Sequence, residues 1–269
     1  MKGIRKLFFG LIFVTLFGVG FKVDAKAVSG VNVLYEDGDG TNWGDSDTST
    51  KGIRGSVRFV DGDFPSEGDD PVEYKCQLLG GTDSDNYELI GDTKVYLRKL
   101  TSGACEIKVD EYDVWKPYNS GTDWYFPVQA DGSTGYAGTY VDKDTIRDKI
   151  VSKYESFSEK TETVFARIVK VSDGTETKSA NKSITLGQVK SDSGAYCGTT
   201  KFMDIVVDDS SSTSLPVYLF PGEKLNLKTK STIDTNVYTW NDWTATGGTI
   251  GTGTKDSTTF TMATTPVAV

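Results

Sequence analysis

Short apolar segments alternate with turn-forming clusters along most of this chain. Clusters of Gly, Ser, Thr, Asp and Asn recur at intervals of about ten residues and separate segments rich in Val, Ile, Thr, Tyr and Phe, which is typical of an all-β protein. The expected strands span residues 31–35, 53–60, 72–79, 94–100, 105–109, 124–129, 163–171, 182–186, 205–207, 217–219, 224–229, 243–246 and 258–262. We therefore expect a mainly β fold, with a β-sandwich-like N-terminal region and a small C-terminal β module.

Two connections between these strands have the composition of tight hairpin turns. Thr101-Ser102-Gly103 separates the strands at 94–100 and 105–109. The strand at 163–171 runs into residues 172–175, where an Asp-Gly pair suits the positive φ of such a turn.

One segment departs from the two-residue alternation of a strand. Its apolar residues recur at the 3.6-residue spacing of a helix, with charged residues between them: Ile146, Ile150, Val151, Tyr154 and Phe157. The pattern predicts one amphipathic helix over residues 142–157, with Asp142 or Asp144 as its N-cap.

The first 27 residues have the three-part layout of a signal peptide. A basic start is followed by an uncharged apolar stretch at 7–21 and by small residues at Ala25 and Ala27. The apolar stretch is shorter than the roughly 20 residues of a membrane-spanning helix. We expect cleavage after Ala27, or after Ala25, and a secreted, extracellular protein that is free or associated with a cell surface. The alternative is that the segment stays uncleaved and anchors the chain.

Residues 208–214 contain no apolar side chain and have the composition of a linker. We place a domain boundary there. It separates a β-rich region at 28–207, with a possible seam near residues 132–138, from the module at 215–269.

The C-terminal module carries an ordered series of motifs. Phe220-Pro221-Gly222-Glu223 leads into a strand in which apolar side chains alternate, and Trp243 and Gly247-Gly248 follow. A second alternating strand, 258–262, reads Thr-Thr-Phe-Thr-Met. This order resembles the divergent InlB B-repeat module of bacterial surface proteins over about residues 215–269. It departs from that family after Met262, where Ala replaces the usual Pro.

The resemblance implies a small β module in a bacterial surface setting, and it implies no catalytic residue. A generic immunoglobulin-like or PKD-type module is the alternative, because both the Tyr-Thr-Trp at 238–240 and the Gly-Gly turn suit those families as well.

Charge and composition exclude several classes of function. The chain has a formal net charge of −9 and no histidine. Removal of the first 27 residues, which carry a net +4, leaves −13, a balance that opposes binding to nucleic acid. Without histidine, Ser-His and Cys-His catalysis and His-ligated catalytic zinc are excluded. We expect no membrane span after signal cleavage.

The chain has three cysteines, at positions 76, 105 and 197. An oxidising compartment therefore allows at most one intrachain disulfide. We expect the pair Cys76 and Cys105, which are nearest in sequence. The alternative is that all three are buried thiols.

An acidic segment near the N-terminus is a candidate calcium loop. Its carboxylates are Asp37, Asp39, Asp45 and Asp47. Counted from Asp37, positions 1 and 3 of an EF-hand-type loop are acidic, but the sixth residue is Asn42 where that loop needs Gly. A solvated loop is the alternative, and no other cofactor is expected.

Aromatic residues in a region rich in Gly, Ser and Asp are candidates for ligand binding. They are Trp115, Tyr118, Trp124 and Tyr125. Such rings form stacking platforms for sugars and contact patches for proteins, although Tyr and Trp are also common core residues.

For catalysis, only paired carboxylates remain. The pairs Asp110/Glu111 and Asp142/Asp144 are candidates, but acidic residues are abundant in a chain of this charge. We expect a secreted, non-enzymatic surface or matrix protein that binds a surface glycan or protein, or serves in structural display. The alternative is a carbohydrate-binding module or a carboxylate-dependent glycosidase.

Overall fold

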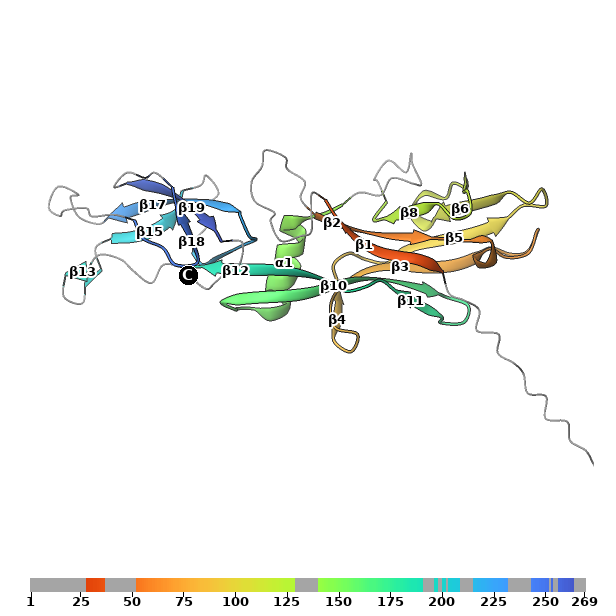
Figure 1. Ribbon diagram of the computed structural model, residues 1–269, viewed down its shortest axis with the longest axis horizontal. Coiled ribbons are helices and arrows are strands. Elements are labelled where there is room, and N and C mark those ends of the chain that lie inside the picture. Colours follow the sequence, from red (N-terminus) through yellow and green to blue (C-terminus); the bar gives the residue numbers. More distant parts are fainter. Residues whose placement is uncertain are drawn as a thin grey trace, which may run out of the picture.

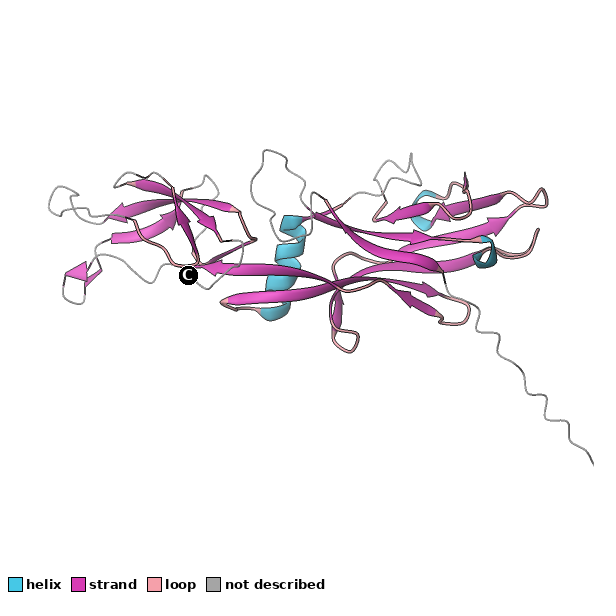
Figure 2. Ribbon diagram, in the orientation of Figure 1, coloured by secondary structure: helices cyan, strands magenta, loops and turns pink. Residues whose placement is uncertain are grey.

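The computed structural model describes residues 28–36, 52–128, 140–190, 196–197, 200–201, 203–208, 215–231, 243–251, 253 and 256–263. The segments at 1–27 and 132–138 and the candidate calcium loop lie outside these residues. Within them the chain is mainly β, with antiparallel sheets and one α-helix (Figure 2), so the expected fold class is confirmed.

Two sheets form the larger part of the molecule (Figure 1). In the first, β2 (Gly52–Arg58) pairs with β1 (Ser29–Tyr35), β8 (Asp123–Phe126) and β9 (Val141–Asp142). The second sheet has the order β16 (Val217–Leu219), β12 (Lys182–Val189), β10 (Glu159–Lys170), β3 (Val72–Gly81), β5 (Thr93–Lys99), β6 (Cys105–Val109) and β7 (Lys116–Pro117). The short strands β11 (Glu176–Lys178) and β4 (Asn86–Glu88) pair with β10 and β3. The 3-10 turns η1 (Asp61–Asp63) and η2 (Asp110–Tyr112) complete this region.

The main core lies between these two sheets. On each strand alternate side chains face inward, so that Trp124 and Phe126 of β8 meet residues such as Leu78 of β3 and Leu97 of β5 in one buried cluster. The arrangement is a β-sandwich, as expected for the N-terminal region. Both expected hairpins form, β5–β6 and β10–β11, and the glycine in each turn, Gly103 and Gly174, has a positive φ.

The helix α1 (Lys143–Tyr154) lies within the expected span. Its N-cap is Asp142, whose carboxylate accepts hydrogen bonds from the amide and the hydroxyl of Thr145, both at 2.8 Å. Burial opposes ionisation of this carboxyl, but these hydrogen bonds outweigh it and lower the pKa of Asp142. Ile146 and Ile150 are buried in the sandwich core and fix the helix against the sheets.

A separate sheet forms the C-terminal part, with the order β15 (Met203–Val207), β17 (Lys224–Ser231), β19 (Ser257–Met262) and β18 (Gly248–Ile250). A two-stranded ladder, β13 (Tyr196–Cys197) with β14 (Thr200–Lys201), precedes it. Leu227, Phe260 and Met262 are buried in its own core, and Trp243 packs against them. Residues 243–246 form no strand, in contrast to expectation; the strand in this region begins at Gly248.

The sheet pairing does not follow the boundary expected at residues 208–214. β15, which precedes that segment, pairs with β17 of the C-terminal sheet. β16, which follows it, pairs with β12 of the sandwich, and the adjacent Phe220 is buried in the sandwich core. The two parts therefore exchange strands across the expected linker, most of which lies outside the described residues.

Candidate binding site

Two of the four aromatic candidates belong to the core. Trp124 is 0% exposed and Tyr118 is buried. The Tyr118 hydroxyl accepts a hydrogen bond from the Phe59 amide at 3.0 Å and donates to the Thr122 carbonyl. The four aromatic candidates therefore do not form one ligand-binding surface. The reason is strand alternation: on β8, Trp124 faces inward and its neighbour Tyr125 faces outward.

The other two aromatic candidates lie on different sheets, each against an arginine. Tyr125, on the outer face of the first sheet, lies under the Arg54 guanidinium, 4.0 Å from its ring centroid. Arg54 is also 4.5 Å from the Tyr140 ring. Trp115 lies against the outer face of the second sheet, with its ring centroid 4.1 Å from the Arg98 guanidinium. The two rings therefore form separate surfaces.

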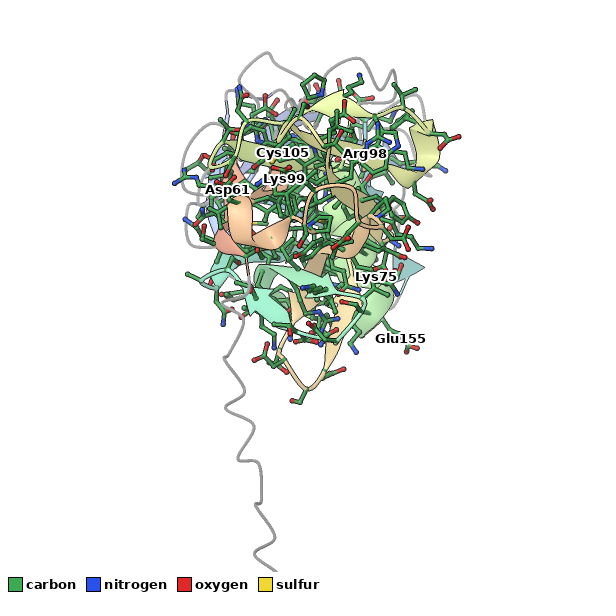
Figure 3. The ribbon with its side chains drawn as sticks, turned by 90° about the vertical axis from the view of Figure 1, so that its right-hand side faces the viewer. Asp61, Lys75, Arg98, Lys99, Cys105 and Glu155 are labelled. Atoms are coloured by element: carbon green, nitrogen blue, oxygen red, sulfur yellow. The ribbon has the colours of Figure 1, made fainter. Side chains whose placement is uncertain are left out.

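The surface around Trp115 is built by a cross-strand ladder. In the β5–β6 hairpin, Tyr96 lies opposite Lys108 and Arg98 opposite Glu106. These positions face away from the core because their neighbours on both strands face into it. The segment between η2 and β7 then lays Trp115 over the outer face. We refer to these five residues as the Trp115 cluster; Figure 3 views the molecule from the end that carries them and labels Arg98.

The charges of the Trp115 cluster are balanced locally. Arg98 forms an ion pair of 2.5 Å with Glu106, and the Lys108 ammonium lies 2.8 Å from Asp113 and 5.5 Å from the Trp115 centroid. The hydrogen bond and charge of Lys108 lower the pKa of Asp113. The cluster therefore presents an aromatic ring held by cations, with carboxylates at its edge.

Tyr96 completes the cluster. Its hydroxyl donates a hydrogen bond of 3.1 Å to Asp110. Desolvation and this hydrogen bond to a carboxylate raise the pKa of Tyr96.

The expected disulfide does not form, because Cys76 and Cys105 are free thiols. Cys76 lies opposite Thr93 at one end of β5, and Cys105 lies opposite Lys99 at the other end. At 3.3 Å per residue the two are about 20 Å apart along the sheet, whereas a disulfide needs Cα atoms within about 7 Å. The pairing was wrong because proximity in sequence does not place two cysteines on adjacent strand positions.

The two thiols differ in their surroundings. Complete burial raises the pKa of Cys76, with a contribution from Asp92. Cys105 is only half-buried, and desolvation together with Asp61 raises its pKa while Lys99 opposes the shift. Figure 3 shows these charged neighbours beside Cys105. Neither thiol is activated as a nucleophile.

The candidate metal ligands Asp37, Asp39, Asp45 and Asp47 lie outside the described residues. Among the residues that the structure describes, no group of three or more His, Cys, Asp or Glu side chains is placed to hold a metal ion.

The candidate catalytic carboxylates have structural partners. Asp142 caps α1, Asp144 pairs with Arg147 at 2.5 Å, and Asp110 accepts the Tyr96 hydroxyl. The side chain of Glu111 is not among those that the structure describes. These contacts explain each described carboxylate without a role in catalysis.

One buried ion-pair cluster was not expected from the sequence. The Glu223 carboxylate, 5% exposed, lies 2.7 Å from the Lys143 ammonium. It also accepts hydrogen bonds of 2.6 and 2.7 Å from one guanidinium nitrogen of Arg147. The Phe220 amide donates a further hydrogen bond of 2.7 Å to it. We call Lys143, Arg147 and Glu223 the Glu223 cluster; it joins α1 to the turn between β16 and β17.

A partial signal for this cluster exists in the sequence. Lys143 and Arg147 are four residues apart and share one face of the helix, and Glu223 belongs to the motif of the C-terminal module. Their meeting depends on a tertiary contact between residues 76 positions apart, which local patterns do not encode.

Comparison of the chain with protein-family models, with curated proteins and with solved structures found no match. The similarity to the InlB B-repeat therefore remains a prediction. No helix among the described residues has the length and apolar character needed to cross a bilayer.

Proposed function

We propose that this protein is secreted and acts without catalysis, as a surface or matrix protein that binds a protein partner through the Trp115 cluster. The signal-peptide pattern, the acidic composition and the β-sandwich support this role. The single observation that carries it is a half-buried tryptophan on an outward sheet face, which lies against Arg98 and near Lys108. Trp, Tyr and Arg are the residues enriched at the centres of protein interfaces.

The geometry favours a protein over a glycan as the partner. A sugar stacks on an open face of an aromatic ring, and the Arg98 guanidinium, 4.1 Å from the centroid of Trp115, occupies one of the two faces of this ring. The rest of the half-buried ring and the surrounding ion pairs remain for contact. Such a mixed surface suits the polar and aromatic side chains of another protein. A carbohydrate-binding module is the alternative, and it predicts glycan recognition at the same ring.

The test measures binding of the labelled mature protein, residues 28–269, to cells of the organism that encodes it. Loss of a central tryptophan contact costs about 2 kcal/mol or more, so Trp115→Ala should weaken binding by about 30-fold. Tyr125→Ala is the matched control, because it removes a comparable ring–arginine stack from the other sheet. Binding should disappear after protease treatment of the cells.

A glycan array, run with and without calcium, separates the alternatives. A sugar would replace the protein partner if the protein bound an arrayed glycan, if Trp115→Ala abolished that binding, and if cell binding survived protease treatment. Hydrolysis of an arrayed glycan would establish an enzyme. Equal binding by Trp115→Ala and the wild type would refute the role of the cluster.

A further inference from the structure

The charges in and around the Trp115 cluster are unequally exposed to solvent. The side chains of its two cations are largely covered, since Lys108 is 21% exposed and Arg98 is 33% exposed. Glu106, the partner of Arg98, is covered as well. The side chain of Asp113 is 89% exposed, although its carboxylate lies 2.8 Å from the Lys108 ammonium. The charge that this surface presents most openly is therefore negative.

The exposed carboxylates belong to the segment that joins β6 to Trp115. Asp110 is the first residue of η2, and its side chain is exposed. Asp113 follows the turn in the left-handed region, with a φ of 46°, which aspartate enters more readily than most residues. Val114 comes next and is 55% exposed, more than any other large hydrophobic residue within the described ranges. We call Asp110, Asp113 and Val114 the η2 rim.

The η2 rim is narrow. On β5, the outward position after Tyr96 toward the start of the strand is Lys94, and Lys75 lies opposite Lys94 on β3. The outer face of the sheet thus becomes basic one strand position beyond the cluster. The rim therefore suits a short segment of a partner rather than a broad surface.

Carboxylates beside apolar and aromatic side chains are complementary to arginine and lysine. The cationic head of either residue pairs with a carboxylate, while its aliphatic stem packs on apolar surface. Val114 next to Asp113 offers such a surface. The formal net charge of the chain, −9, has the same sign as the rim. It speeds the approach of a cationic partner and opposes that of an acidic one.

We propose that the protein partner of the Trp115 cluster presents a basic segment, whose arginine or lysine side chains pair with Asp110 and Asp113 and pack against Val114. This inference rests on the proposed function and adds the chemical class of the partner to it. The tryptophan supplies most of the affinity, as a central aromatic contact does. The charges at the rim set the association rate, the salt dependence and the choice of partner.

The experiment measures association of the labelled mature protein with cells of the organism that encodes it. It is run in about 0.1 M and about 1 M NaCl, which shorten the screening length from about 10 Å to about 3 Å. The variant Asp110→Lys/Asp113→Lys reverses both charges of the rim. The control Asp148→Lys/Glu159→Lys makes the same change in net charge at exposed positions on α1 and β10. Circular dichroism shows whether each variant is folded.

In the lower salt, reversal of the rim should weaken binding by at least about tenfold, mainly through slower association. The control should weaken it by less than about threefold, because its charges lie away from the contact. Asp110→Asn/Asp113→Asn keeps the shape of both side chains and should cost about 2- to 5-fold. In the higher salt, wild type and reversed variant should bind within about threefold of each other.

Three results would overturn the proposal. Tighter binding by the reversed variant would indicate an acidic partner, equal losses in the reversed variant and the control would assign the effect to net charge alone, and wild-type binding by the reversed variant would leave the rim without a role. Trp115→Ala separates this inference from the proposed function. If Trp115→Ala weakens binding and reversal of the rim does not, only the basic segment is refuted. If Trp115→Ala binds as the wild type does, the proposed function itself fails.

Discussion

Replacement of Glu223 by glutamine tests how the C-terminal part is fixed to the sandwich. Glu223→Gln keeps the shape of the side chain but removes the charge that Lys143 and Arg147 share. It also turns one of the two acceptor oxygens into a donor that faces these cations. The Phe220 amide, which donates to the Glu223 carboxylate, then either loses its acceptor or donates to the neutral amide oxygen of the glutamine.

The expected cost follows from the burial of the three groups. Removing one partner of a buried ion pair costs about 3–5 kcal/mol. The side chains of Lys143 and Arg147 are 17% and 21% exposed, so water reaches both cations in part and the lower end of the range applies. A loss of about 3 kcal/mol should lower the melting temperature by roughly 6–12 °C for a protein of this size.

The assay is urea unfolding followed by circular dichroism, with thermal melting as a second measure. Glu159→Gln, at an exposed position on β10, is the control and should change the unfolding free energy by less than about 0.5 kcal/mol. A double-mutant cycle with Arg147→Met should give a coupling of at least about 1 kcal/mol. If Glu223→Gln cost no more than the control, or the coupling were absent, the two parts would not be joined by this cluster.

Three further predictions concern the sandwich. Asp142→Ala should cost about 1 kcal/mol through loss of the helix cap. Hydrogen bonds lower the pKa of Asp142 below 3.8 in the folded protein. The stabilisation by the ionised carboxylate should therefore be fully present above pH 3.8 and be lost as the pH falls through the folded-state pKa of Asp142. Urea unfolding at several pH values across that range measures this dependence. Iodoacetamide should label Cys105 in the native protein and Cys76 only after unfolding. Peptide mass spectrometry identifies the labelled cysteine, and labelling of Cys76 in the native protein would contradict its burial. Gly55→Ala should destabilise the protein by about 1–3 kcal/mol, because the added methyl would overlap a phenylalanine ring on β8. Gly62→Ala, which meets no atom within 4 Å, should be neutral in the same unfolding assay.

The regular elements could be predicted because their signals are local. The strand at 105–109 and the strand at 217–219 have the expected bounds, and α1 begins directly after its expected cap Asp142. The short strands β4, β7 and β9 were missed, because two or three residues carry no periodicity and these segments lack the Val-Tyr-Leu composition of the equally short strand at 217–219. Residues 243–246 were expected as a strand, but Trp243 packs onto the C-terminal core from an irregular segment.

The candidate site could be predicted only in part, because its residues come together through the pairing of strands. The region around Trp115 was identified from aromatic composition, yet composition does not tell Trp124, at 0% exposure, from Tyr125 on the opposite face. That distinction depends on the register of β8 against β2. Cys76 and Cys105 illustrate the same limit. The strand between them, β5, was expected, but only its pairing shows that the two cysteines lie at its opposite ends.

The exchange of strands has a consequence for how the protein acts. Leu219 and Phe220 are consecutive, yet Leu219 is buried in the C-terminal core and Phe220 in the sandwich core. Val189, at the end of β12, also contributes to the C-terminal core. The β12–β16 pair thus passes from one core into the other, and the Glu223 cluster ties the following turn to α1. A flexible linker would let the two parts bind independently, whereas here a strand pair that contributes to both cores joins the sandwich directly to the C-terminal sheet. A partner that contacts both parts would therefore meet a preorganised surface and lose less entropy on binding.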